Sequence, residues 1–416
     1  MKKILLILFI LFLMFGGYII YDNYIANRIP KLVTEEEVVN LDELTIYGTH
    51  LNLHGSSVND ENLDLVLYNG EFLDYDINIS DNFFDLSEYI NRGIDLEKIP
   101  VGTYYAFLRS STKDDKDRDV YRYYIIKNNT DYKETEYYTF SNTNNKILIG
   151  TDDYYETMMF TVSKNTDKEI YDIVIDPGHG GMDSGANRNG KKESDYTMKV
   201  ALNLKKKMEE KGITVKLTRE ENQLSSNETL PDYGTHGRAV INHEVHAKYL
   251  FSIHLNSNSA SYVHGLEIYT PADINYDFAK NMASNIVSMA NTTYSTNKIN
   301  KVSDGIYTRT FTEGDITSSL KEYEEKNINP YEITTKSNYY YMIRETGGIM
   351  TGAYVDDRNA PKKIGNPYYN SNVGSEAYLL ELAYLTNYND LDNIDRNLDN
   401  YTDAIVETFL PIFTNE

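Results

Sequence analysis

The sequence contains no cysteine and no tryptophan. The absence of cysteine excludes disulfides, thiolate metal sites and a cysteine nucleophile. Any metal site in this chain must therefore use His, Asp or Glu side chains. Tyrosine, with 38 residues, supplies most of the aromatic surface.

Positive charge is also scarce, because 40 Lys and Arg residues stand against 63 Asp and Glu residues. The formal net charge of −23 argues against nucleic acid or an anionic lipid surface as the main partner, since a polyphosphate would repel such a body. Neutral or mixed-charge substrates therefore remain as candidates. At 416 residues the chain is long enough for two folded domains and a connecting or anchoring piece.

Residues 1–21 predict a transmembrane anchor. Two lysines precede an apolar run from Ile4 to Ile20, whose length is at the lower limit of about 17 residues for a spanning helix. The lysines favour a cytoplasmic start, which places the rest of a single-pass chain outside the cell membrane. No small-x-small cleavage site is obvious, so an uncleaved anchor is favoured over a cleaved signal peptide, which would leave the protein secreted. Residues 22–41 are polar and predict a linker.

Residues 42–165 predict an all-β domain. Short runs of β-branched and aromatic residues alternate with Gly, Asn, Asp and Ser turns, a spacing that favours an immunoglobulin-like β-sandwich. His50 and His54 lie in this pattern and are interpreted as surface or core residues rather than metal ligands. We find no catalytic motif in this domain, so the pattern indicates a spacer or a module that contacts the cell wall or a protein partner.

From Ile170 onward, strands alternate with helices, which predicts an α/β domain with a mostly parallel sheet over residues 170–416. The predicted strands are 173–175, 213–217, 249–253 and 266–269, and the predicted helices are 194–211, 237–248 and 278–291. Ligands of such sheets bind at the carboxyl ends of the strands.

Two histidines stand at or just beyond the carboxyl ends of predicted strands of this domain. His179 stands after Ile173 to Ile175 and a chain-breaking Asp-Pro-Gly, and the glycines around it leave room for a ligand to approach the imidazole. His254 ends a second apolar strand. The two imidazoles can lie close together if the strands are neighbours, which the sequence alone does not establish.

Glu193 is the candidate for a third ligand, because it precedes the helix predicted from residue 194. Alone it would be read as a helix-start residue favoured by the helix dipole. Together with two histidines, it completes a set of two imidazoles and one carboxylate. Such a set leaves a fourth position open for water, as in catalytic zinc sites.

Glu381 lies inside an otherwise apolar predicted strand, in the stretch from Leu379 to Asn387. Burying a lone carboxylate is costly, so this residue should have a partner or a purpose. Apolar surroundings would raise its pKa and a nearby cation would lower it, a balance that suits proton transfer. We therefore predict that Glu381 is the catalytic base.

These stretches resemble the four signature blocks of the zinc-dependent N-acetylmuramoyl-L-alanine amidases of the type 3 family, in the family's order. The blocks are Asp176 to Gly181, Glu193, Ser252 to Asn256 and Leu380 to Asn387. The resemblance covers residues 170–416. It implies a six-stranded α/β fold, one zinc ion bound by His179, Glu193 and His254, and a catalytic role for Glu381. It also implies cleavage of the amide bond between N-acetylmuramic acid and L-alanine in peptidoglycan, for cell-wall remodelling or division.

Arg344 and Asn256 are the candidate substrate-binding residues. Arg344 lies in a stretch similar to a family strand near the site, where it binds a peptide carboxylate or the developing oxyanion, or else forms a surface ion pair. Arg238 resembles a family arginine and is interpreted as structural. His243 and His246 are three residues apart rather than four, so they lack the zincin spacing and are interpreted as solvated surface.

Residues 292–377 depart most from the family pattern and predict an inserted lid or substrate wall. Two alternatives to the amidase remain open. One is a zinc peptidase that acts on the stem peptide by the same metal chemistry. The other is a non-catalytic wall-binding or regulatory protein, and the β domain could serve either protein by binding the wall or a divisome partner.

Overall fold

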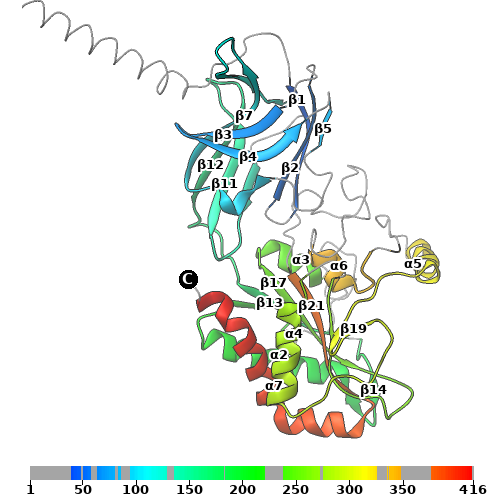
Figure 1. The fold of residues 1–416 in the computed structure, drawn as a ribbon. Coiled ribbons are helices and arrows are strands. Elements are labelled where there is room, and N and C mark those ends of the chain that lie inside the picture. Colours follow the sequence, from blue (N-terminus) through cyan, green and yellow to red (C-terminus); the bar gives the residue numbers. More distant parts are fainter. Residues whose placement is uncertain are drawn as a thin grey trace, which may run out of the picture. The chain divides into compact units, whose positions relative to one another are not determined.

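The computed structural model describes residues 39–47, 50–57, 63–79, 83–85, 94–128, 135–181, 183–220, 238–271, 275–325, 335, 337–347 and 376–414. These residues form two compact units (Figure 1). One unit is built mainly from Leu51–Tyr138 and Asn145–Lys164, and the other mainly from Asn165–Glu416. The domain boundaries inferred from the sequence, 42–165 and 170–416, stay predictions.

The predicted anchor, residues 1–21, lies outside the described residues. So does the predicted linker, except for residues 39–41, which begin a strand. Among the residues that the structure describes, no helix is long and apolar enough to cross a membrane. The anchor therefore stays a prediction.

Among its described residues, the first unit is built from strands and one short 3₁₀ helix. These elements are β1 (Val39–Tyr47), β2 (His50–Ser57), β3 (Leu63–Tyr68), β4 (Phe72–Ile79), β5 (Phe83–Asp85), β6 (Ile94–Asp95), η3 (Leu96–Lys98), β7 (Gly102–Lys113), β8 (Asp119–Ile125), β9 (Lys127–Asn128), β10 (Thr135–Tyr138), β11 (Asn145–Thr151) and β12 (Met158–Lys164). One sheet has the order β5-β2-β1-β9 with β6 on β2, and the other has the order β10-β11-β12-β7-β3-β4 with β8 on β7. Buried and partly buried side chains alternate along β11, as expected for a sheet with one face in a core. The immunoglobulin-like topology stays a prediction.

The second unit alternates strands and helices, as the sequence predicts. Its elements are β13 (Ile173–Pro177), β14 (Asn187–Arg188), β15 (Lys191–Lys192), α2 (Glu193–Glu209), β16 (Val215–Leu217), α3 (Arg238–Glu244), β17 (Tyr249–Asn256), β18 (Glu267–Tyr269), α4 (Asp277–Met289), β19 (Lys301–Ser303), β20 (Ile306–Tyr307), α5 (Glu313–Glu325), α6 (Tyr341–Gly347), β21 (Glu376–Tyr384) and α7 (Tyr388–Thr414).

The central sheet of this unit has the order β16-β13-β17-β21-β18-β20-β19. Four neighbouring pairs are parallel, whereas β18 runs antiparallel to β21 and β19 runs antiparallel to β20. The predicted α/β fold with a mostly parallel sheet is confirmed, but the sheet has seven strands rather than six. The sequence predicted neither β19 nor β20, because strands of three and two residues are too short to show a hydrophobic period.

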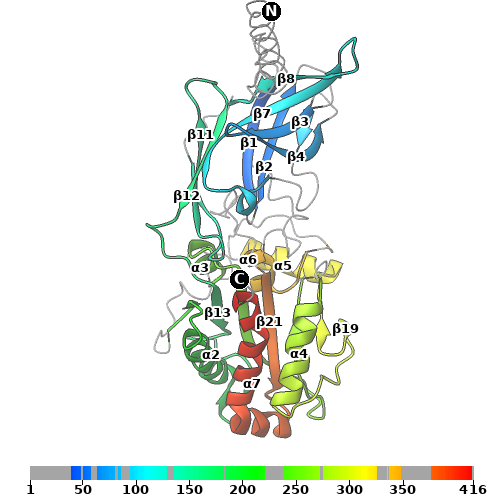
Figure 2. The same cartoon turned by 60° about the vertical axis from the view of Figure 1, so that its left-hand side comes forward.

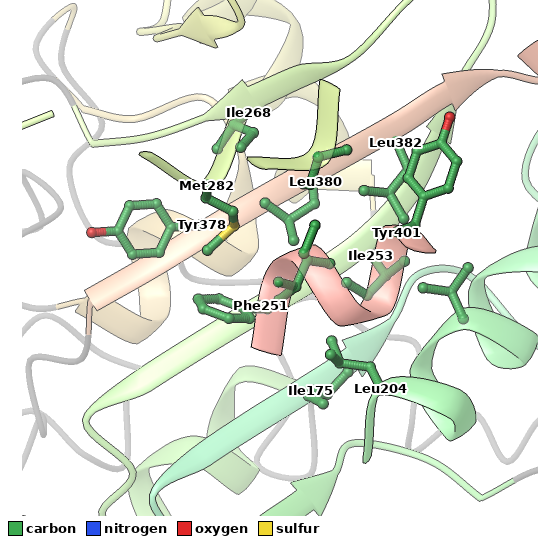
Figure 3. Close-up of a cluster of buried hydrophobic side chains, with 14 of the residues drawn as sticks. Ile175, Leu204, Phe251, Ile253, Ile268, Met282, Tyr378, Leu380, Leu382 and Tyr401 are labelled. Carbon is green, nitrogen blue, oxygen red and sulfur yellow. The ribbon is translucent and has the colours of Figure 1, made fainter. Parts of the chain in front are cut away.

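Helices cover both faces of this sheet (Figures 1 and 2). Side chains of a strand point alternately to opposite faces, so each strand contributes to two cores. The larger core lies under α2, α4 and α7, and Figure 3 shows part of it around Phe251, Ile253 and Leu380. The smaller core lies on the side of α6 and includes Val174 and Leu250. The functional site extends from this smaller core.

Candidate functional site

His179, His254 and Glu381 lie toward the carboxyl ends of three neighbouring strands, β13, β17 and β21. Val174 and Leu250 belong to the smaller core. Further along the same strands, the positions that point to this face are polar, with Asp176 on β13 and His254 on β17. His254 stands opposite Glu381 in the parallel pairing of β17 and β21. The strands that carry the two histidines are therefore neighbours, which is what the zinc hypothesis requires.

Three side chains converge on one point at this edge. Glu193 Oε1 lies 3.1 Å from His179 Nε2 and 3.0 Å from His254 Nδ1. A tetrahedral zinc ion with ligands at 2.0–2.1 Å separates its ligand atoms by roughly 3.3 Å. The two nitrogen atoms and the carboxylate oxygen are therefore spaced to hold one metal ion, and their chemistry fits zinc.

Backbone groups fix the carboxylate of Glu193. Its Oε1 accepts a hydrogen bond from the backbone N–H of Leu255 (3.0 Å), and its Oε2 accepts one from that of Ala186 (2.9 Å). Glu193 is buried and is the first residue of α2. Glu193 therefore begins a helix and also directs its carboxylate at the two histidines, so the two interpretations of this residue are compatible.

Asp183 orients the imidazole of His179. Its Oδ2 lies 2.6 Å from His179 Nδ1, and its Oδ1 accepts a hydrogen bond from the N–H of Gly185. We infer from these partners that Nδ1 carries the proton and that Nε2 is directed at Glu193. Burial lowers the pKa of His179, but the hydrogen bonds and charges of Glu193 and Asp183 outweigh burial and raise it above the usual value.

Two glycines make room for these side chains. A Cβ atom on Gly178 would lie 2.5 Å from His254 Nε2. At Gly185, which has φ +61°, a Cβ atom would lie 2.6 Å from His179 Cδ2 and 2.7 Å from Glu193 Oε2. The site therefore requires glycine at both positions.

Asp176 is fully buried beneath the site. It accepts hydrogen bonds from the hydroxyls of Ser252 and Thr218, both at 2.6 Å, and lies 3.5 Å from Arg238 Nε. Burial raises the pKa of Asp176, but the charge of Arg238 and the two hydroxyls outweigh burial and hold it below the usual value. Arg238 also donates a hydrogen bond to the carbonyl of His179 (3.3 Å), a structural contact of the kind expected from the sequence.

Arg219 is a supporting residue that sequence reasoning missed. Its Nε donates to the carbonyl of Pro177 (3.0 Å), and a terminal nitrogen donates to the carbonyl of Ser194 (3.2 Å). Arg219 therefore ties the loop that carries His179 to the helix start that carries Glu193. The available signal was its position two residues after β16, at the same edge of the sheet.

Glu381 is buried on β21, and its Oε2 has no hydrogen-bond partner. Burial raises the pKa of Glu381 well above its usual value, and the charges of Glu193 and Glu267 raise it further. Glu267 also escaped sequence reasoning, because a carboxylate in a short strand has no distinctive pattern.

The histidines, Glu193 and Glu381 line one cavity of about 440 Å³. Its remaining walls combine aromatic, apolar and polar side chains: Arg238, Leu255, Asn256, Ser257, Phe311, Ser319, Tyr339, Tyr340, Tyr341, Met342, Arg344 and Leu379. Several of these residues belong to the predicted insertion 292–377, of which the structure describes 292–325, 335, 337–347 and 376–377. The described part of the insertion therefore forms a wall of the cavity.

The structure places both candidate substrate-binding residues at this cavity. The carboxamide of Asn256 donates to Glu267 Oε2 (3.1 Å). Arg344 is 1% exposed and donates to the carbonyls of Asn338 (2.7 Å) and Tyr339 (2.9 Å). The alternative of a surface ion pair for Arg344 is therefore wrong, and so is its placement in a strand, because residues 341–347 form α6.

The interpretation of the two neighbouring histidines as solvated surface is wrong for His246. This residue follows α3 with φ +50° and is 7% exposed. Its Nε2 lies 2.7 Å from Lys168 Nζ. The sequence pattern missed this burial because the helix ends at Glu244, so His246 is not on its polar face.

A comparison with known proteins finds a family that matches the α/β unit. A family model described as N-acetylmuramoyl-L-alanine amidase matches residues 173–409. The probable cell wall amidase LytH of Staphylococcus aureus is 36% identical over 100 residues, which cover 23% of this chain and 30% of that protein. The chain thus spans under a third of the length of this curated relative.

Two solved structures are similar to part of this chain. Cwp6 from Clostridium difficile is 24% identical with a TM-score of 0.37, over 59% of this chain and 29% of that chain. The N-acetylmuramoyl-L-alanine amidase AmiC2 of Nostoc punctiforme is 20% identical with a TM-score of 0.36, over 60% of this chain and 99% of that chain.

Gly185→Ala should weaken Zn²⁺ binding at least tenfold, because the new methyl group would displace His179 and Glu193. Gly190→Ala is the matched control, since Gly190 also has a positive φ (+78°) but a Cβ atom there would have no neighbouring atom within 4 Å. Competition with a chromogenic chelator measures both affinities. Equal affinities in the two variants would contradict the role of Gly185.

Asp176→Asn should lower the free energy of unfolding by about 2–4 kcal/mol at pH 7, because it leaves Arg238 without its buried countercharge. Since the folded-state pKa of Asp176 is below its usual value of 3.8, the stabilisation is present above about pH 4 and is lost as the pH falls further. Urea unfolding of metal-free protein should show the deficit shrinking between about pH 4 and pH 2. Asp304→Asn, on the exposed surface, is the control, and a deficit independent of pH would refute the electrostatic explanation.

Proposed function

The chain belongs to the N-acetylmuramoyl-L-alanine amidase family, and from this membership we propose that it hydrolyses the amide bond between N-acetylmuramic acid and L-alanine in peptidoglycan. One observation carries the proposal: His179, Glu193 and His254 converge at one end of a cavity whose wall also contains the buried Glu381. The acidic chain suits a substrate other than a polyanion.

We propose one zinc ion as the cofactor, bound by His179 Nε2, Glu193 Oε1 and His254 Nδ1. The donor set supports this proposal, since two imidazoles and one carboxylate leave a position open to the cavity. Zinc in such a set supplies a Lewis acid that polarises a carbonyl and lowers the pKa of water to about 7.

Glu381 acts as the proton carrier in the proposed reaction. Its unpartnered Oε2 takes a proton from the attacking water, whose oxygen adds to the carbonyl carbon of the lactyl group. The carbon–nitrogen bond then breaks, and Glu381 returns the proton to the departing alanine nitrogen. The products are a lactyl carboxylate on the glycan and a free amino group on the stem peptide.

The cellular setting is proposed from the sequence. Lys2, Lys3 and the apolar run to Ile20 support a single-pass anchor that leaves the two folded units outside the cell membrane. There they would meet peptidoglycan, and cleavage of the segment would release the protein instead. The β unit would then contact the wall or a divisome partner.

Mass spectrometry of fragments that the full chain releases from purified peptidoglycan tests the activity, with added zinc and with a chelator. We expect zinc-dependent release of intact stem peptides that begin with a free alanine amino group. Cleavage inside the peptide would instead identify a zinc peptidase, and no release under either condition would identify a wall-binding or regulatory protein.

Glu381→Gln should reduce the turnover number about 10²–10⁴-fold, because it removes the proton acceptor while keeping the size of the side chain. Glu376→Gln is the matched control, since Glu376 lies on the same strand at its opposite end. Bound zinc should stay the same in both variants. Full turnover by Glu381→Gln would assign the base to another residue.

A further inference from the structure

Glu267 is a buried carboxylate that the proposed reaction does not use. It lies on β18, is 0% exposed and stands directly opposite Glu381 in the antiparallel pairing of β18 and β21. Side chains at paired positions point to the same face, with Cβ atoms about 5 Å apart. His254, Glu381 and Glu267 therefore form a row across three neighbouring strands, from the metal-binding set to a second buried carboxylate.

Four side-chain donors surround this carboxylate. Oε1 accepts from the hydroxyls of Ser295 (2.7 Å) and Tyr384, and Oε2 accepts from the hydroxyl of Tyr269 (2.8 Å) and the carboxamide of Asn256 (3.1 Å). An ionised carboxylate has about four lone-pair sites. Glu267 is thus saturated, and the charge-assisted bonds fix each donor more firmly than neutral bonds would.

The two oxygens of Glu267 differ in whether their hydrogen-bond donors line the cavity. The donors to Oε1, Ser295 and Tyr384, do not line the cavity, whereas Asn256, a donor to Oε2, does. The other Oε2 donor, Tyr269, packs edge-on against Tyr340 with ring centroids 4.7 Å apart.

Tyr340 connects Tyr269 to the cavity. It lines the cavity wall, and its hydroxyl is hydrogen-bonded to that of Tyr269. Burial and then the charge of Glu381 raise the pKa of Tyr340 to about 12. The hydroxyl of Tyr340 therefore keeps its proton at neutral pH. Because Tyr269 donates its own proton to Glu267, Tyr340 donates to Tyr269, and the oxygen of Tyr340 is left to accept a hydrogen bond from a substrate N–H.

We propose that Glu267 is a positioning residue for the amidase reaction, and this inference rests on the proposed function. Through Oε2 it holds the carboxamide of Asn256 directly and the hydroxyl of Tyr340 through Tyr269. Both groups face the cavity beside Glu381. There they bind the polar amide groups that flank the scissile bond and hold the carbonyl carbon in line with the attacking water.

Two tyrosine-to-phenylalanine variants separate this role from a structural one. Tyr269→Phe removes the link from Oε2 to Tyr340, and Tyr384→Phe removes the same kind of buried hydroxyl from Oε1. On soluble glycan–peptide fragments, Tyr269→Phe should lower kcat about tenfold with KM changed less than twofold, because small misplacements of reacting groups are costly. Tyr384→Phe should leave kcat within about twofold of wild type, since a lost hydrogen bond away from the cavity affects mainly stability.

Glu267→Leu tests the centre of the network. It should lower kcat further than Tyr269→Phe, and adding Tyr269→Phe to it should have little extra effect, because coupled residues are not additive. Bound zinc should be unchanged in every variant. Equal losses of kcat in Tyr269→Phe and Tyr384→Phe would overturn the proposal, and this pair decides the question if Glu267→Leu fails to fold.

A measurement without turnover separates this inference from the proposed function. The side-chain amide NMR signal of Asn256, assigned by its loss in Asn256→Ala, should shift in Glu267→Leu and stay in place in Tyr384→Phe. If the wild-type protein releases no alanine amino groups, the proposed function fails, and this signal still decides whether Glu267 holds Asn256. An unchanged signal in Glu267→Leu would overturn the positioning role.

Discussion

The functional site depends on how the buried carboxylate of Glu193 is held. One oxygen lies within 3.1 Å of both imidazoles, and the two oxygens also accept backbone N–H groups of Leu255 and Ala186. Backbone donors cannot rotate away as side chains do, so the carboxylate has one orientation. Its partners come from two other segments: His179 and Ala186 from the loop after β13, and His254 and Leu255 from the end of β17. Glu193 itself begins α2. The position of a single carboxylate therefore fixes how three parts of the chain meet.

Four buried carboxylates surround this edge of the sheet, and their hydrogen bonds distinguish their roles. Asp176 and Glu267 are surrounded by hydroxyl and amide donors, and Glu193 faces two imidazoles. Glu381 differs, because its Oε2 has no partner and the neighbouring charges of Glu193 and Glu267 add to the effect of burial on its pKa. A protein tolerates such a costly group where it has a task. The contrast singles out Glu381 as the group able to exchange a proton.

The sequence revealed those parts of the site that have a local signature. Each histidine stands at or just beyond the end of an apolar strand, and Glu381 interrupts an apolar run. A polar side chain in such an apolar context can be recognised from the sequence alone. Contacts between distant segments have no such mark. The pairing of β17 with β21, the position of Glu267 opposite Glu381 and the hold of Arg219 on two loops all follow from strand order. The stretch around Arg344 was interpreted from its similarity to a family strand, but it forms α6.

The two sides of the cavity are stabilised in different ways. The metal-binding side uses backbone amides, carbonyls and glycines, which leave little freedom to the ligands. Another part of the wall is aromatic. There Arg344 donates to the carbonyls of Asn338 and Tyr339, and its guanidinium group also lies 5.1 Å from the ring centre of Phe311. Changes in the aromatic wall can therefore alter the shape of the cavity without moving the metal-binding set. This arrangement allows substrate preference to vary while the chemistry at His179, Glu193 and His254 stays the same.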